Sequence, residues 1–62
     1  MRFEELEKTL PEGQPFCVYT EKELLITDSD RHDLEAQEIM KNKKVLEIRL
    51  TDGDTLDIFV EE

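Results

Sequence analysis

The residues closest to a chemical site lie in one short polar segment that contains Asp28, Asp30, His32 and Asp33. Carboxylate oxygens and an imidazole nitrogen are ligands that divalent cations accept. A calcium-binding loop of the EF-hand type would, however, need glycine at its sixth position and glutamate at its twelfth. Counted from Asp28, those positions hold Asp33 and Ile39. We therefore predict that the segment is a solvated loop that supplies helix N-caps, and that it binds no metal.

A second acidic segment, residues 52–57, fails the same test. A calcium loop counted from Asp52 would place Asp57 where the glycine belongs and would extend past Glu62. Its Asp52-Gly53-Asp54 triplet is instead typical of a tight turn between two strands.

Nucleophilic and acid–base chemistry have few candidates in this chain. His32 is the only histidine and Cys17 the only cysteine. A general base needs a nucleophile or a substrate pocket arranged around it, and the sequence identifies neither. Cys17 has apolar neighbours and no cysteine to pair with, so we interpret it as a small buried hydrophobe. With Gly13 and Gly53 as the only glycines there is no phosphate-binding loop, and we predict a protein that is not an enzyme and has no cofactor.

The charge balance restricts the partners. The 62 residues include 17 acidic and 8 basic side chains, a formal net charge of −9 at pH 7. Such a chain is repelled by nucleic acids and anionic lipids unless its cations gather on one face. Lys41, Lys43 and Lys44 form the one basic cluster, which we interpret as a solvated turn. Because the chain also lacks a long apolar stretch, we expect a cytoplasmic protein that contacts neither nucleic acid directly nor a membrane.

Two short helices are predicted to position these groups. Phe3, Leu6 and Leu10 have the spacing of an amphipathic helix that Pro11 ends. A second helix is expected over residues 34–40, after the polar segment with its candidate N-caps.

Two hairpins are predicted as well. Residues 16–20 and 23–27 are rich in aromatic and β-branched side chains, although Glu21-Lys22 is unusual turn chemistry. Residues 45–60 alternate apolar and polar side chains around Gly53.

The register of the second hairpin follows from its alternation, because opposed residues share a face of the sheet. The apolar triplets match only if Leu50 pairs with Leu56, Ile48 with Ile58, and Leu46 with Val60. The same register places Arg49 opposite Asp57 and leaves a three-residue loop at 52–54.

Together these elements predict one acidic α+β domain over residues 1–62. The expected order is helix, hairpin, helix, hairpin, with an antiparallel sheet of about four strands and the helices packed on one face. The predicted core comprises Phe3, Leu6, Leu10, Phe16, Val18, Leu24, Ile26, Ile39, Leu46, Ile48, Leu50, Leu56, Ile58 and Val60.

Strict alternation also places Tyr19, Leu25, Val45 and Phe59 on the sheet face opposite this core. Either another segment covers that face or it binds a partner. Our preferred hypothesis is a non-catalytic protein-interaction module, such as a regulator, an inhibitor or an antitoxin-like factor. It would use these four residues for contact and its negative charge to attract a partner, possibly a basic one.

Two alternatives remain open from the sequence. One is a nucleic-acid mimic, of the kind phages encode, that inhibits a DNA-binding protein with carboxylates in place of phosphates. Its candidate carboxylates are Glu4, Glu5, Glu7, Asp28, Asp30, Asp33, Glu35 and Glu38. The other is a homodimer whose sheets pack face to face or join edge to edge.

Overall fold

The computed structural model describes residues 1–51 and 53–62, and it shows two α-helices and a four-stranded sheet. The elements follow along the chain as α1 (Phe3–Thr9), β1 (Phe16–Tyr19), β2 (Leu24–Thr27), the short 3-10 helix η1 (Asp28–Asp30), α2 (Leu34–Met40), β3 (Val45–Thr51) and β4 (Thr55–Val60). The prediction of a small α+β protein is confirmed.

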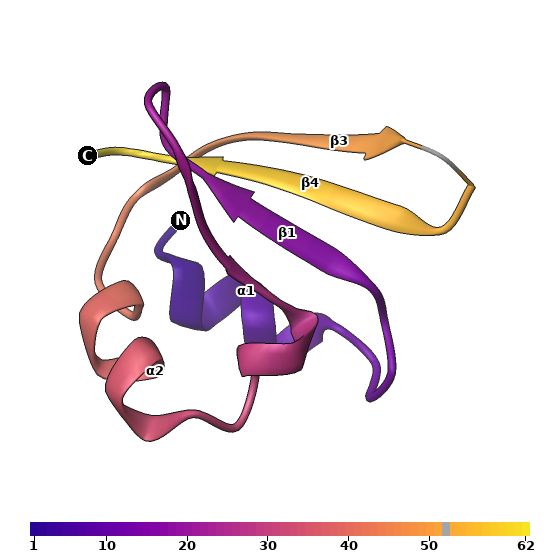
Figure 1. Ribbon diagram of the computed structural model, residues 1–62, viewed down its shortest axis with the longest axis horizontal. Helices are drawn as coiled ribbons and strands as arrows, with labels where there is room; N and C mark the ends of the chain where they lie inside the picture. Colours follow the sequence, from indigo (N-terminus) through magenta and orange to yellow (C-terminus); the bar gives the residue numbers. More distant parts are fainter. Residues whose placement is uncertain (52) are drawn as a thin grey trace.

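The sheet is mixed, so the prediction of an antiparallel sheet was wrong. Its strand order is β2-β1-β4-β3, and the two central strands, β1 and β4, run parallel to each other. The pairs within each hairpin are antiparallel. Local sequence patterns predict the hairpins, but the direction in which one hairpin joins the other depends on the connection through α2. Figure 1 shows both helices on the same side of the sheet, with the β3–β4 hairpin extending beyond them.

Helix α1 ends where the sequence predicts. The backbone N–H of Arg2 donates to the Glu5 carboxylate at 3.0 Å, which satisfies one group at the first turn. At the other end Leu10 is extended, with φ −81° and ψ 131°. The ring of Pro11 disfavours a helical conformation in the residue before it, so the helix stops at Thr9.

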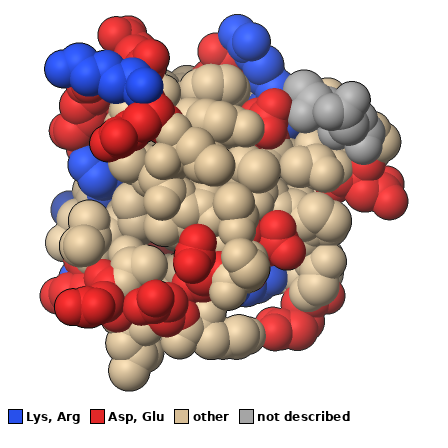
Figure 2. Space-filling view, in the orientation of Figure 1, with Lys and Arg blue, Asp and Glu red and all other residues tan. Residues whose placement is uncertain are grey.

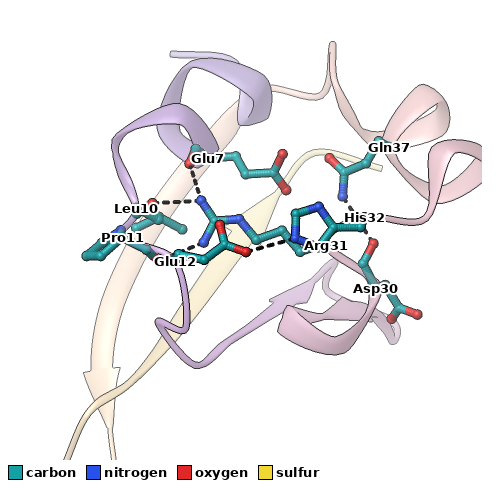
Figure 3. Close-up of polar contacts among 8 residues, drawn as sticks. All are labelled: Glu7, Leu10, Pro11, Glu12, Asp30, Arg31, His32 and Gln37. Carbon is teal, nitrogen blue, oxygen red and sulfur yellow. Dashed lines mark hydrogen bonds and ion pairs between the residues drawn. The ribbon is translucent and has the colours of Figure 1, made fainter.

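Arg31 connects the segment after β2 to the end of α1 (Figure 3). Its guanidinium donates to the backbone carbonyls of Leu10 at 2.7 Å, Pro11 at 2.8 Å and Glu7 at 3.1 Å. The carbonyls of Glu7 and Pro11 also accept from the backbone N–H groups of Leu10 and Gln14, each at 3.1 Å. All three carbonyls lie near the negative dipole end of the helix, where a cation is favourable. Sequence reasoning missed this contact, because backbone acceptors have no signature in the sequence.

Helix α2 begins after Asp33, one of several candidate caps in the polar segment, and it buries a different residue from the one predicted. The Asp33 carboxylate accepts from the backbone N–H groups of Glu35 and Ala36 at 3.0 and 3.2 Å. Met40 is buried in the core, whereas Ile39 is 70% exposed. The prediction that Ile39 belongs to the core was therefore wrong.

The core lies between the helices and the covered side of the sheet. Its buried residues are Phe3, Leu6, Phe16, Val18, Ile26, Met40, Ile58 and Val60, and Leu10, Leu25, Ala36, Val45 and Leu56 pack against them. The prediction was wrong for four strand residues that are exposed: Leu24, Leu46, Ile48 and Leu50. The last three belong to β3, which is an edge strand that extends past the helices (Figure 1).

The register of the second hairpin is confirmed except at one end. Ile48 pairs with Ile58 and Leu50 with Leu56. The loop follows Thr51, and Gly53 there has φ 80°, a conformation that glycine adopts without the strain of a side chain. Asp52, which the sequence predicts as the first loop residue, lies outside the described residues. The predicted pair of Leu46 with Val60 was wrong, because Val45 pairs with Val60 and leaves Leu46 as an extra residue in a β-bulge.

The first hairpin is confirmed, and its turn uses a threonine where a glycine or asparagine is common. The Thr20 hydroxyl accepts from the backbone N–H groups of Lys22 and Glu23 at 3.2 and 3.3 Å. This pairing also contains a bulge, because Val18 pairs with Ile26 while Tyr19 pairs with Leu24. Leu25 is the extra residue of β2.

Candidate interaction surface

The sheet has a second face, opposite the helices, to which all four strands contribute. Side chains that alternate with buried Phe16, Val18 and Ile58 must lie on it. The strand pairings add the corresponding residues of β2 and β3. We call this surface the Tyr19–Phe59 face; it comprises Cys17, Tyr19, Leu24, Glu47, Arg49, Asp57 and Phe59.

An aromatic stack lies at the centre of the Tyr19–Phe59 face. The parallel pairing of β1 with β4 sets Tyr19 beside Phe59, and their rings stack with centroids 5.4 Å apart and an interplanar angle of 22°. Both residues are half-buried. The centre of the Arg49 guanidinium lies 5.3 Å from the Phe59 ring centroid, within the range of a cation–π contact. Three neighbouring strands thus contribute one continuous row of flat side chains.

Charged neighbours hold this row in place. The Arg49 guanidinium donates two hydrogen bonds to the Glu47 carboxylate, one of them at 3.2 Å. These hydrogen bonds and the carboxylate charge raise the pKa of Arg49, so it stays protonated at neutral pH. A hydrogen bond with the Cys17 side chain, followed by desolvation and the charge of Asp57, raises the pKa of Tyr19 above its ordinary value. Tyr19 therefore remains a neutral phenol that can donate or accept a hydrogen bond.

Only two of the four residues predicted for this face lie on it. Tyr19 and Phe59 form its centre, whereas Leu25 and Val45 pack against the core on the other side. Each misplacement has the same cause: a bulge inserts one residue, and a shift of one residue moves a side chain to the opposite face. The bulge in β2 brings Leu24 to the Tyr19–Phe59 face in place of Leu25.

Sequence reasoning also missed the parts that Arg49 and Glu47 take in this surface. The predicted pairing of Arg49 with Asp57 is confirmed, and it already placed the guanidinium on the face that bears Phe59. Its approach to the ring depends on side-chain conformations, for which the sequence carries no signal.

The acidic segment after β2 supplies a helix cap, Asp33, as predicted, but its residues 28–30 form the 3-10 helix η1 and not a loop. The Asp28 carboxylate accepts from the N–H of Phe16 at 3.3 Å, and that of Asp30 accepts from Thr27 at 3.1 Å. No group of three or more potential metal ligands is found within residues 1–51 and 53–62.

His32 interacts with a residue of the loop after α1 (Figure 3). Its Nε2 atom lies 2.8 Å from a Glu12 carboxylate oxygen, and both side chains are exposed. This contact lowers the pKa of Glu12, through the hydrogen bond first and the imidazolium charge second.

A shallow groove of about 280 Å³ lies between β2 and α2, lined by Leu25, Ile26, Ala36, Ile39, Met40 and Lys43. Its lining is apolar except for Lys43, so it offers few of the convergent polar groups that orient a small ligand in an active site.

Neither helix of the described chain has the length and apolar composition needed to cross a membrane. Comparison of the chain with protein-family models, with curated proteins and with solved structures found no match.

Proposed function

We propose that this protein is a non-catalytic protein-interaction module that acts in the cytoplasm as a regulator, inhibitor or antitoxin-like factor. It binds its partner through the Tyr19–Phe59 face. The single observation that carries this proposal is the stack of Tyr19 on Phe59, with Arg49 against it, on the side of the sheet away from both helices.

Aromatic and arginine side chains supply most of the binding energy at many protein interfaces. They do so most effectively when they are already held in the bound conformation, because less side-chain entropy is then lost on binding. The stack and the Glu47 hydrogen bonds give the Tyr19–Phe59 face this preorganisation.

The surface charge supports a basic partner. The net charge is −9, and Figure 2 shows acidic side chains over much of the surface in view, with uncharged surface between them. Interfaces commonly combine an uncharged centre with polar and charged surroundings. The surplus of negative charge raises the rate of encounter with a positively charged partner.

The test is quantitative capture from a lysate of the source organism with immobilised wild-type protein and the Tyr19→Ala/Phe59→Ala variant. We expect the variant to lose at least about tenfold of the captured partner, because truncation of a hot-spot residue costs about 2 kcal/mol or more. Leu34→Ala is the matched control, since Leu34 is 85% exposed on α2. Equal capture by wild type and the double variant would contradict the proposal.

Both aromatic residues are half-buried, so the fold of the variant must be checked by circular dichroism and thermal melting. Phe59→Leu provides a milder test, because it keeps an apolar side chain while it removes the stack. We expect it to weaken capture without unfolding the protein.

Salt separates this proposal from nucleic-acid mimicry. Exposed charge pairs are screened at high ionic strength, whereas apolar contacts are not. Capture that persists at about 1 M salt supports the Tyr19–Phe59 face. Capture that is lost there, and that DNA displaces, supports mimicry through the acidic side chains.

A further inference from the structure

The outer edge of β3 has features that the proposed binding face does not use. With seven residues β3 is the longest strand, and in the sheet order its one neighbour among the described strands is β4. An edge of this kind presents backbone N–H and C=O groups to another strand, and proteins usually block it with a short strand, proline or lysine. Residues 45–51 contain neither proline nor lysine.

The chain covers only the start of this edge. The carbonyl of Met1 accepts the backbone N–H of Val45 at 2.8 Å. Within the described residues, no further backbone hydrogen bond joins residues 46–51 to a segment other than β4. The free part of the edge therefore begins at Leu46.

Apolar side chains accompany the free edge. Leu46, Ile48 and Leu50 are 60%, 41% and 66% exposed. Ile48 and Leu50 lie on the helix side of the sheet, as their pairing with Ile58 and Leu56 requires. They are nevertheless exposed, and Figure 1 shows the β3–β4 hairpin extending beyond the helices.

The geometry points to a second copy of this chain as the occupant: two β3 strands join antiparallel about a two-fold axis at Ile48, which makes one continuous eight-stranded sheet. The argument is the order of residues in the strand, Leu46-Glu47-Ile48-Arg49-Leu50. About that axis Ile48 faces Ile48 of the second copy, Leu46 faces Leu50, and Glu47 faces Arg49. Both chains contribute the same patch, as a two-fold interface requires.

Other registers lack this complementarity. An axis at Glu47 would oppose two carboxylates, and an axis at Arg49 would oppose two guanidinium groups, which is destabilising for directly opposed residues. An axis between two residues would pair apolar side chains with charged ones on the same face. The register centred on Ile48 is therefore the favoured one, and its pairs at residues 47, 48 and 49 lie clear of the bulge at Leu46.

The existing contacts are compatible with this arrangement. Arg49 and Glu47 already interact within one chain, and both are exposed, so each can also reach its counterpart in the second copy. The pairing uses the edge of β3 and leaves the Tyr19–Phe59 stack of both copies accessible. The net charge of −9 per copy opposes association at low ionic strength.

The test is sedimentation equilibrium of the full chain at about 0.15 M salt, from about 10 µM to about 1 mM protein, the range in which weak dimers dissociate. We expect wild type to form a dimer, and Arg49→Glu and Glu47→Arg each to weaken it by about tenfold or more, because each sets like charges opposite one another twice. A wild-type protein that remains monomeric at the highest concentration overturns the inference.

A charge-swapped double variant and a mixture of the two single variants test the register itself. The double variant Glu47→Arg/Arg49→Glu restores opposite charges across the axis, and we expect it to dimerise within about threefold of wild type. An equimolar mixture of the two single variants also pairs opposite charges, so it should form a mixed dimer more tightly than either variant forms a dimer with itself.

Leu34→Lys, on the exposed face of α2, is the control that should leave the dimer unchanged. Dimers that persist in both single variants, or that fail to return in the double variant while its circular dichroism spectrum is native, would show that another surface is used and would overturn the inference. Glu47 and Arg49 also belong to the Tyr19–Phe59 face, but the measurement uses the purified chain without a partner, so its outcome does not depend on the proposed partner binding.

Discussion

The strands β4 and β3 have the same alternating pattern and pair directly with each other, but their apolar side chains differ in burial. Ile58 is completely buried, whereas Ile48, its neighbour across the pair, is 41% exposed. The difference arises because β4 lies at the centre of the sheet above the helices, while β3 lies at its edge. An alternating pattern thus reports which side of the sheet a residue faces, and not whether anything covers that side.

The largest expected effect is the loss of stability when the buried residue of this pair, Ile58, is truncated. Ile58→Ala should lower the free energy of unfolding by about 2–5 kcal/mol, because it removes apolar surface from the core and leaves a cavity. Ile48→Ala should cost less than about 1 kcal/mol, the range of a cross-strand contact. Urea unfolding followed by circular dichroism measures both values. If Ile58→Ala unfolds the protein, Ile58→Val and Ile48→Val should give the same ranking with smaller losses in the free energy of unfolding. Equal losses at the two positions would contradict the comparison.

Arg31 and Arg49 extend the comparison to charged side chains in the two regions. Arg31→Ala should cost about 1–3 kcal/mol, because it removes three hydrogen bonds from a charged donor to carbonyls near the end of α1. Arg49→Ala removes an exposed ion pair and a cation–π contact, which solvent and salt screen, so it should destabilise the protein less than Arg31→Ala. Thermal melts of the two variants, with Arg31→Lys as a partial replacement, would show the difference. A larger loss for Arg49→Ala would mean that the edge region contributes more to stability than the helix connection.

Leu50→Ser tests whether the exposed end of β3 contributes to the stability of the monomer. Leu50 is 66% exposed, so the monomer should change in stability by no more than about 0.5 kcal/mol. Urea unfolding at a protein concentration low enough to exclude dimers is the measurement. A loss comparable to that of Ile58→Ala would show that some segment covers Leu50 in solution.

The smallest expected effect is on the pH dependence of stability, through the exposed contact between His32 and Glu12. The contact lowers the pKa of Glu12 from its usual 4.5, so the folded state binds that proton less readily than the unfolded state. Its contribution to stability is therefore present above pH 4.5 and is lost as the pH falls through the lowered pKa. Glu12→Gln should remove this part of the pH dependence below pH 4.5. Acid titrations of the two proteins that coincide there would contradict the assignment.

Much of the fold could be predicted, and the failures have identifiable causes. The helices, the hairpins and the pairing of Ile48 with Ile58 follow from local patterns of apolar residues and turn residues. The errors at Leu25 and Val45 come from bulges, and no residue pattern in β2 or β3 predicts them. Of the candidate surface, Tyr19 and Phe59 were predicted, while Leu24 and the stacking of Arg49 were not.

The amino-acid sequence by itself determined which segments become helices or strands, the loop at Gly53 and the side of the sheet on which most strand residues lie. These features depend on neighbours a few residues apart. The tertiary structure alone decided that β1 runs parallel to β4, that Arg31 meets the end of α1 and that β3 lies uncovered at an edge. These features depend on which distant segments pack together, and the free energy of that packing is shared by many residues, so no single stretch of the chain records it.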